Sequence, residues 1–175
     1  MGGSGGQGVV LAAKVLGEAA VLEGKFALQT QAYGAEARGS LTKSEVIISD
    51  GRINFPAVRQ CDYLVTMNQD STDALIGTLK EGGTLIVDGS NVPHALRRGR
   101  IVHSLPLTET ARKGMGDPFF ANMVMLGALV KLSGAVSLAS LEEAIRTKTS
   151  AKWAESNARA VRLGFSLPAE GAPQP

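Results

Sequence analysis

The sequence predicts an α/β fold with a doubly wound, mostly parallel sheet, one hairpin and a group of helices towards the carboxyl end. Three observations lead to this prediction. A glycine-rich turn opens the chain and runs directly into an apolar stretch with helical spacing. Short apolar runs typical of buried strands then alternate with turn signals. After residue 107 the pattern is helical only. The fold class is therefore Rossmann-like.

The first half of the chain is expected to supply the sheet, because its apolar runs are short and bounded by turns. A first helix is expected over residues 9–23, with Gly24 as its stop. A second helix lies between two strands and makes a βαβ unit with them. The expected strands are 25–31, 41–49, 63–67, 84–88 and 100–104, and the second helix is 69–80.

One hairpin interrupts the parallel pattern. Asp50-Gly51 is a strong turn signal between two stretches that read as strands. The strand at 41–49 and residues 52–55 are therefore predicted to pair as a hairpin, which Pro56 ends.

The second half is expected to be helical. Gly164 reads as a carboxyl-terminal cap of the last helix. The expected helices are 108–113, 119–132, one that starts after Ser137 or Ser140 and ends at 146, and 152–163. We expect a single domain over residues 1–167, followed by a polar, Pro-rich tail at 168–175 that is disordered.

Composition narrows the class of protein. The 175 residues, of which 44% are hydrophobic and 19% charged, are enough for one domain with its own core. The net charge of +2 is too small to argue for a nucleic-acid partner. No run of about 18 apolar residues is present, so no membrane partner is expected either.

The single cysteine limits the chemistry further. Cys61 can form neither an internal disulfide nor a Cys-rich metal site. It precedes an apolar run, so we expect a buried structural thiol rather than a nucleophile. A lone cysteine and the lack of a signal-peptide pattern favour a cytoplasmic location.

The glycine turn is the first candidate site. Its residues, which read G-x-G-x-x-G, are Gly3, Ser4, Gly5, Gly6, Gln7 and Gly8. Glycines allow positive φ angles and close approach of a ligand to main-chain N–H groups, and the helix that follows adds unpaired N–H groups. A phosphate or a carboxylate would fit there. Because glycines also serve tight packing of a strand on a helix, the motif alone leaves ligand binding and packing as alternatives.

A nicotinamide cofactor is disfavoured. Its site needs an acidic residue about 20 positions further on, at the end of the second strand. Leu28-Gln29-Thr30-Gln31 stands there instead, Glu23 comes too early, and Glu36 lies beyond the strand. A Walker loop is excluded because no Gly-Lys-Ser/Thr follows the glycines.

The loop at 32–39 is the second candidate site. It follows the second strand at the same edge of the sheet as the glycine turn, where open α/β sheets bind their ligands. It gathers Tyr33, Glu36 and Arg38. One interpretation is a solvated turn with a weak Glu36–Arg38 ion pair. We favour a polar rim over a substrate or cofactor, or a subunit contact, because two such loops converge.

Other polar residues give weaker indications of function. Asn122 lies within an apolar helix, where a buried amide needs hydrogen-bond partners, so it is expected either to join core elements or to reach the cleft. His94 and His103 share no metal-like spacing. Asp88, at a strand end, is expected to orient the loop around Asn91 or to serve as a cap. No catalytic residue and no metal ligand is assigned.

Several short motifs are informative in combination. They are Gly3-Ser4-Gly5-Gly6-Gln7-Gly8-Val9, Tyr33-Gly34-Ala35-Glu36-Ala37-Arg38-Gly39, Glu45-Val46-Ile47-Ile48-Ser49-Asp50, Asn122-Met123-Val124-Met125-Leu126-Gly127, Leu141-Glu142-Glu143-Ala144, and Asn157. Together they resemble the gamma subunit of 2-oxoacid:ferredoxin (acceptor) oxidoreductases, over roughly residues 3 to 165. The second motif is most similar to the 2-oxoglutarate branch. Pyruvate, branched-chain oxoacid (ketoisovalerate) and indolepyruvate enzymes are close relatives.

The resemblance implies a non-autonomous subunit. The complete enzyme would decarboxylate a 2-oxoacid on thiamine diphosphate with Mg, pass electrons through iron–sulfur clusters to ferredoxin, and form an acyl-CoA (succinyl-CoA from 2-oxoglutarate). Those cofactors would belong to partner alpha, beta and possibly delta subunits, which agrees with a single cysteine here. CoA, as co-substrate of the complex, is carried onto residues 4–8 and onto Tyr33, Glu36 and Arg38 only. The alternative is a stand-alone nucleotide- or CoA-binding module.

The amino terminus departs from the family pattern. The resemblance implies a strand of about half a dozen apolar residues before the glycine turn, whereas Met1 and Gly2 precede it here. We expect the first strand to be missing and the sheet to have a gap, or an edge where its centre should be. Open strand edges pair with other chains, so a swapped amino-terminal region and a homodimer of the isolated chain are expected.

Overall fold

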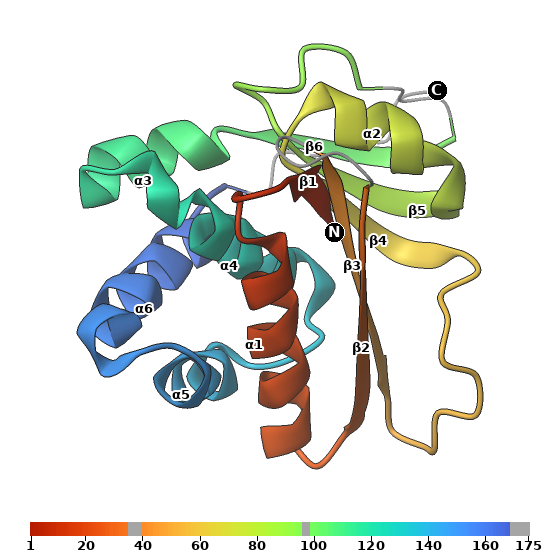
Figure 1. Ribbon diagram of the computed structural model, residues 1–175, viewed down its shortest axis with the longest axis horizontal. Helices are drawn as coiled ribbons and strands as arrows, with labels where there is room; N and C mark the ends of the chain where they lie inside the picture. The colour runs from red at the N-terminus through yellow and green to blue at the C-terminus, as the bar shows by residue number, and fades with distance from the viewer. Residues whose placement is uncertain (35–39, 96–98, 169–175) are drawn as a thin grey trace.

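A computed structural model describes residues 1–34, 40–95 and 99–168. Its centre is a six-stranded sheet in the order β2-β3-β1-β4-β5-β6 (Figure 1). Strands β1, β4, β5 and β6 are parallel, whereas β3 runs antiparallel to both of its neighbours. The bounds are β1 Gly2–Ser4, β2 Phe26–Tyr33, β3 Leu41–Ser49, β4 Cys61–Thr66, β5 Leu79–Asp88 and β6 Ile101–Leu105. The predicted mixed, mostly parallel sheet is confirmed.

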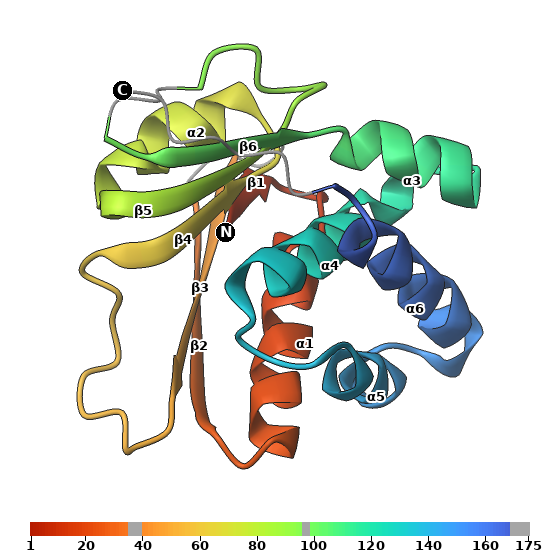
Figure 2. The same ribbon diagram turned by 180° about the vertical axis from the view of Figure 1, so that it is seen from behind.

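Helices cover both faces of this sheet. Most of them, including α1 and α4, lie on one face, and α2 lies on the other, as the two opposite views show (Figures 1 and 2). The helices are α1 Val9–Leu22, α2 Gln69–Leu75, α3 Leu107–Met115, α4 Ala121–Ser133, α5 Leu138–Lys148 and α6 Ala151–Phe165. Two short 3₁₀ turns, η1 Ile76–Thr78 and η2 Pro118–Phe120, precede β5 and α4.

The central strands are apolar on both faces because each face is covered. In β4, Val65 belongs to the core under α1 and α4, and Leu64 belongs to the smaller core under α2. In β5, Ile86 faces the first core and Leu85 the second. This strict alternation follows from the two-residue period of a strand.

Helices α4 and α6 cross with their backbones in contact. A Cβ atom placed on Gly127 of α4 would overlap the carbonyl oxygen of Val161, and one on Gly164 of α6 would overlap the carbonyl oxygen of Val124. Glycine at both positions therefore allows a separation that any larger residue would prevent. The prediction that Gly164 ends the last helix is wrong, because α6 continues to Phe165 and Gly164 is buried at the crossing.

The predicted hairpin between residues 41–49 and 52–55 is also wrong. Strand β3 pairs antiparallel with β2 from Phe26 opposite Ser49 to Tyr33 opposite Thr42. Residues 52–55 form no strand, and they belong to the long connection between β3 and β4 (Figure 1). Asp50 and Gly51 lie in a bend, but β3 forms its hairpin with β2, which precedes it in the chain.

A short first strand is present, which corrects the expectation that it is missing. Gly2, Gly3 and Ser4 form β1 at the centre of the sheet, opposite Lys43, Thr42 and Leu41 of β3. On its other side β1 pairs with β4 only at Gly2 and Thr66. Beyond Met1 the strands β3 and β4 continue apart from each other, and the expected gap at the centre of the sheet lies there (Figure 1). The single domain at 1–167 stays a prediction, and residues 169–175 of the expected tail lie outside the described residues.

Candidate functional site

The glycine turn links β1 to α1 at the carboxyl edge of the sheet. Gly8 caps α1 in the left-handed region, at φ 72°, which favours glycine. The first helical hydrogen bond runs from Ala12 N to Gly8 O, at 3.1 Å. The N–H groups of the residues between them, 9–11, have no helical carbonyl to bind. The predicted binding of an anion at the turn would depend on these N–H groups.

Gln7 fills part of the turn with its own side chain. Its Oε1 accepts a hydrogen bond from Ser4 N at 2.6 Å, and its main-chain N–H donates to Ser4 O at 3.0 Å. Gly5 N donates to Ser40 O, also at 3.0 Å. Several main-chain donors of the turn are thus satisfied by the protein itself, which gives the turn a fixed shape.

Asn68 holds the turn from the neighbouring strand, and the sequence analysis missed it. Its Nδ2 donates to Ser4 Oγ at 2.7 Å and to Gln7 Oε1 at 3.0 Å. Its Oδ1 accepts from Ser71 N at 2.8 Å and so caps α2. The available signal was its position, directly after a buried strand at the edge of the sheet where ligands bind. Asn68 therefore ties the glycine turn to α2.

Asn122 joins the turn from the opposite side. Its Nδ2 donates to Gly8 O at 3.3 Å, and its Oδ1 accepts from Met123 N at 2.9 Å. A Cβ atom on Gly8 would overlap the Asn122 amide. Of the two roles considered for Asn122, the structure supports the first: its buried side chain connects α4 to the glycine turn.

Tyr33 lies at the end of β2, two strands away from the turn. It pairs with Thr42 of β3, which pairs with Gly3 of β1, so Tyr33 and Gly3 are roughly 10 Å apart across the sheet. Its side chain is 62% exposed, in agreement with a rim position. Glu36 and Arg38, the other predicted residues of this loop, lie outside the described residues.

A buried hydroxyl lies beneath the turn. Thr42 is buried, and its Oγ1 has no hydrogen-bond partner within the part of the chain that the structure describes. A Cβ atom on Gly5 would come 3.9 Å from this oxygen, so Gly5 has room for a small side chain. Thr42 was missed at the sequence level because a threonine in a strand gives no functional signal.

The side chains around the turn are suited to binding a ligand rather than to catalysis. Ser4, Gln7, Asn68 and Asn122 offer hydroxyl and amide groups, and the helix start offers N–H donors. The Asp88 side chain lies elsewhere, at the end of β5, where Asn91 Nδ2 donates to it at 2.8 Å and Thr108 donates through both Oγ1 and N. Asp88 thus holds the Asn91 loop and the start of α3, as one of the two interpretations expected.

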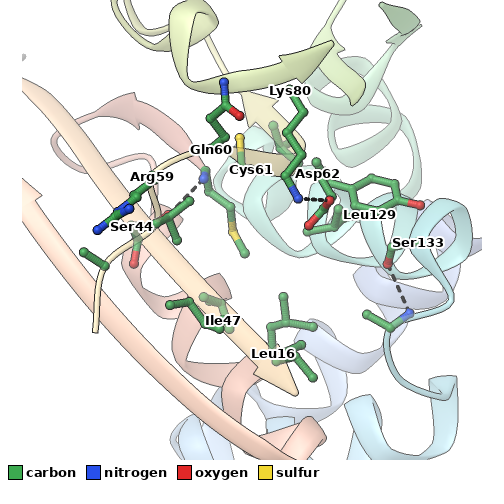
Figure 3. Close-up of a pocket in the computed structure, with 18 of the residues that line it drawn as sticks. Leu16, Ser44, Ile47, Arg59, Gln60, Cys61, Asp62, Lys80, Leu129 and Ser133 are labelled. Carbon is green, nitrogen blue, oxygen red and sulfur yellow. Dashed lines mark hydrogen bonds and ion pairs between the residues drawn. The ribbon is translucent and has the colours of Figure 1, made fainter. Parts of the chain in front are cut away.

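A cavity of about 860 Å³ lies away from the glycine turn, between β3 and β4 (Figure 3). Leu16 of α1 and Leu129 of α4 lie at its base, and Cys61 and Arg59 lie near its rim. The predicted buried thiol is half-buried here, with Cys61 Sγ 3.4 Å from Thr78 O. This cavity is at the amino end of β4, the opposite edge from the glycine turn.

The amino group of Met1 lies in the same cavity. It donates to Ser44 O at 2.9 Å. Burial lowers the pKa of this amino group from 8.0 to about 6, with Lys43 adding to the effect and Cys61 and Glu45 opposing it. A charged group in an apolar surrounding is costly, so this end of the cavity disfavours charge.

Comparison with known proteins identifies the class. The chain matches the pyruvate ferredoxin/flavodoxin oxidoreductase family over residues 1–167. It is 43% identical to the 2-oxoglutarate synthase subunit KorC of Methanothermobacter marburgensis over 97% of this chain and 95% of the relative. It is 33% identical to the common gamma subunit of the pyruvate/ketoisovalerate oxidoreductases of Thermococcus litoralis, over 93% of this chain and 92% of that one.

A solved structure agrees with these relatives. The gamma subunit of the keto/oxoacid ferredoxin oxidoreductase of Geobacter sulfurreducens superposes with a TM-score of 0.84 at 40% identity, over 94% of this chain and 93% of that chain. The chain belongs to the pyruvate ferredoxin/flavodoxin oxidoreductase family and is a subunit of a 2-oxoacid:ferredoxin oxidoreductase. The predicted family is confirmed.

Two further searches concern only the described residues. No helix among them is long and apolar enough to cross a membrane. No group of three or more His, Cys, Asp or Glu side chains among residues 1–34, 40–95 and 99–168 could hold a metal ion.

Proposed function

We propose that the chain is the gamma subunit of a 2-oxoglutarate:ferredoxin oxidoreductase. The observation that carries this proposal is the 43% identity to a 2-oxoglutarate synthase subunit along nearly the whole chain, against 33% to a pyruvate/ketoisovalerate gamma subunit. The complex would oxidise and decarboxylate 2-oxoglutarate, transfer the product to CoA as succinyl-CoA, and pass two electrons to ferredoxin. We place this work in the cytoplasm.

The chain would contribute structure rather than cofactor chemistry. Thiamine diphosphate, Mg and the iron–sulfur clusters would be held by alpha, beta and possibly delta subunits, because one cysteine cannot ligate a cluster. The amide and hydroxyl groups around the glycine turn supply no nucleophile with an adjacent base. The isolated chain would therefore be inactive, and its homodimer stays a prediction.

The glycine turn would receive an anionic group at the contact with the other subunits. The start of α1 offers N–H donors, and the buried Thr42 hydroxyl lies close to Gly5. The phosphates of CoA and a carboxylate of a partner subunit share the required chemistry. Asn122 would keep the turn in shape from below, and Tyr33 would form the exposed rim.

Co-expression with the neighbouring subunits tests the assignment. The purified complex should contain thiamine diphosphate and iron, and should reduce ferredoxin with 2-oxoglutarate and CoA. It should use 2-oxoglutarate at least tenfold better than pyruvate or 2-oxoisovalerate, as judged by kcat/KM. A chain that turns over a 2-oxoacid alone would disprove the subunit role, and a preference for pyruvate would disprove the substrate.

The role of the glycine turn needs a separate variant. Gly5→Val keeps a backbone that any residue can adopt, and its side chain would enter the space above Thr42. Gly77→Ala, at an exposed glycine with no neighbour within 4 Å of an added Cβ, is the matched control. Gly5→Val should raise the KM for CoA or weaken subunit association at least tenfold, with Gly77→Ala unchanged. Calorimetry of CoA with the chain alone decides the alternative, a stand-alone CoA-binding module.

A further inference from the structure

Strand β2 is an open edge of the sheet. It stands at one end of the strand order, and among the described residues no strand pairs with its outer side (Figures 1 and 2). Its eight residues, Phe26–Tyr33, include no charged residue and no proline, and its pairing with β3 contains no bulge. Charges, prolines and bulges are the features by which proteins keep an edge from pairing with another strand. The opposite edge strand, β6, is shorter, with five residues.

The register with β3 fixes which groups of β2 face outwards. Gly34 N donates to Leu41 O at 2.7 Å, so the main chain of Gly34 faces β3. Alternate residues of a strand direct their N–H and C=O groups to the same side. The even-numbered residues of β2 therefore face β3, and the odd-numbered residues face outwards. The outward-facing residues are Ala27, Gln29, Gln31 and Tyr33.

These outward-facing groups are complementary to a second copy of the strand. Two copies of β2 can run antiparallel with Thr30 of one opposite Thr30 of the other. Every outward-facing residue then lies opposite another one, and all of their N–H and C=O groups have partners. A register shifted by two residues would place Ala27 or Tyr33 beyond the end of the other strand.

The same register places each large apolar side chain opposite a small residue. Side chains directly opposite each other in antiparallel strands are close neighbours, so two large ones would compete for the same space. The amides of Gln29 and Gln31 also lie opposite each other and offer both donors and acceptors. The apolar pairs are Phe26 with Gly34, Leu28 with Ala32, and Tyr33 with Ala27.

Pairing would also cover exposed apolar side chains. Phe26 is 49% exposed and Tyr33 is 62% exposed. Val21 and Leu22, at the end of α1, are exposed as well, and the turn at 23–25 joins them to Phe26. Because the two strands run in opposite directions, this apolar end of one copy lies beside Tyr33 of the other. Burial of apolar surface therefore adds to the main-chain hydrogen bonds.

We propose that β2 pairs antiparallel with β2 of a second copy of this chain, about a twofold axis at Thr30, so that the two sheets become continuous. The proposal places the expected homodimer at β2, away from the amino terminus. Tyr33, the predicted rim of the glycine-turn site, lies in this interface, so the second copy borders that site. The inference depends on the strand and not on the proposed function.

Two double variants of the full chain test the register. Gln29→Lys with Gln31→Lys places like charges opposite each other, whereas Gln29→Glu with Gln31→Lys places opposite charges there. Both variants lose the hydrogen bond from Gln29 Nε2 to Ser44 Oγ, so this loss does not distinguish them. Sedimentation equilibrium at low salt measures the dimer dissociation constant of each variant and of the original chain. Circular dichroism verifies that each is folded.

The original chain should dimerise at micromolar concentrations. The variant with two lysines should associate about tenfold more weakly than the variant with Glu and Lys, and added salt should reduce this difference. An original chain that stays monomeric at about 100 µM would overturn the proposal. Equal dissociation constants in the two variants would overturn it as well.

A cross-link tests the position of the twofold axis. Thr30 forms a non-hydrogen-bonded pair with its own copy, with Cα atoms about 4.5 Å apart, which is within the range of a disulfide. Thr30→Cys, made together with Cys61→Ser, should therefore give a disulfide-linked dimer with oxidised glutathione. Ala32→Cys with Cys61→Ser is the matched control. It lies on the same face of β2 but about 14 Å from its own copy, and it should not cross-link.

Equal cross-linking from the two positions would contradict the axis at Thr30. A dimer formed through the cavity between β3 and β4 (the slot) would give neither cross-link and would not respond to the charges at β2. That result would also overturn the proposal. None of these measurements requires substrate or partner subunits.

Discussion

The crossing of α4 with α6 and the slot between β3 and β4 are opposite extremes of packing in one molecule. At the crossing, the Cα atoms of Gly127 and Gly164 lie against carbonyl oxygens of the facing helix. In the slot, two strands with apolar side chains enclose about 860 Å³. Both contain apolar side chains, although charged ones such as Arg59 and Lys80 also line the slot. The two regions differ in how closely the facing backbones approach each other. Four experiments test this difference.

The largest effect is expected at the crossing. Gly127→Ala and Gly164→Ala each place a methyl group where a carbonyl oxygen already lies, so the helices must separate. We expect each to lower the free energy of unfolding by about 3 kcal/mol or more, as overpacking at a rigid contact does. Urea unfolding measures it, with Gly77→Ala as the control. A loss below about 1 kcal/mol would mean that the crossing is loosely packed.

The next effect concerns pH and the slot. The Met1 amino group has a pKa of about 6 in the folded chain and 8.0 in its ordinary state. Between these values the unfolded chain binds more protons, so the free energy of unfolding rises with pH from about 6 to 8, by roughly 2 kcal/mol. Urea unfolding across this range measures the rise. The chain acetylated at its amino terminus is the control, because it has no amino group to titrate, and the rise should disappear in it.

An effect of similar size is expected where α4 meets the glycine turn, at the close contact between Gly8 and Asn122. Gly8→Ala introduces a positive-φ alanine and an overlap with the Asn122 amide. We expect a loss of about 2 kcal/mol. In an Asn122→Ala background the overlap is removed, and the same change should cost about 1 kcal/mol. Equal costs in both backgrounds would show that Asn122 does not restrict Gly8.

The smallest effect is at the surface, where α1 contacts α5. Ser137 N donates to Glu23 Oε1 at 2.6 Å, and this main-chain bond is the main cause that lowers the pKa of Glu23 from 4.5 to about 2. The stabilisation is present above pH 4.5 and is lost as the pH falls towards 2. Because the site is solvent-screened, Glu23→Gln should cost less than about 1 kcal/mol at pH 7 and nothing near pH 2. Thermal unfolding at both pH values measures this.

The sequence predicted elements that depend on local patterns. The helix after the glycine turn, the strand at Leu41–Ser49 and the order of helices in the second half follow from periodicity, and the structure has them. Features that depend on distant partners were predicted wrongly. Asp50-Gly51 indicated a hairpin with the residues that follow, because the local sequence does not show that β3 pairs with β2 instead. Gly164 was interpreted as a helix end because glycine is common there. The sequence does not show that Gly164 is instead required by a carbonyl oxygen of the facing helix.

The same distinction holds for the candidate site. The glycine turn could be read from spacing, and Asn122 could be singled out because an amide in an apolar helix needs partners. Thr42 gave no signal, and Asn68 gave only its position after a strand. The importance of both comes from the strand order β3-β1-β4, which brings three separate segments to one edge. Sequence patterns give the chemistry of each residue, whereas the sheet order decides which residues meet.

The side chain of Gln7 has a consequence for any ligand of the turn. Its Oε1 accepts hydrogen bonds from both Ser4 N and Asn68 Nδ2. An oxygen of a phosphate or carboxylate could accept the same two bonds. An anion arriving at this position must exchange places with a part of the protein. Its net affinity is therefore the difference between two sets of similar hydrogen bonds. Displacement of Gln7 also removes one of the two hydrogen bonds that Asn68 Nδ2 donates beside the start of α2.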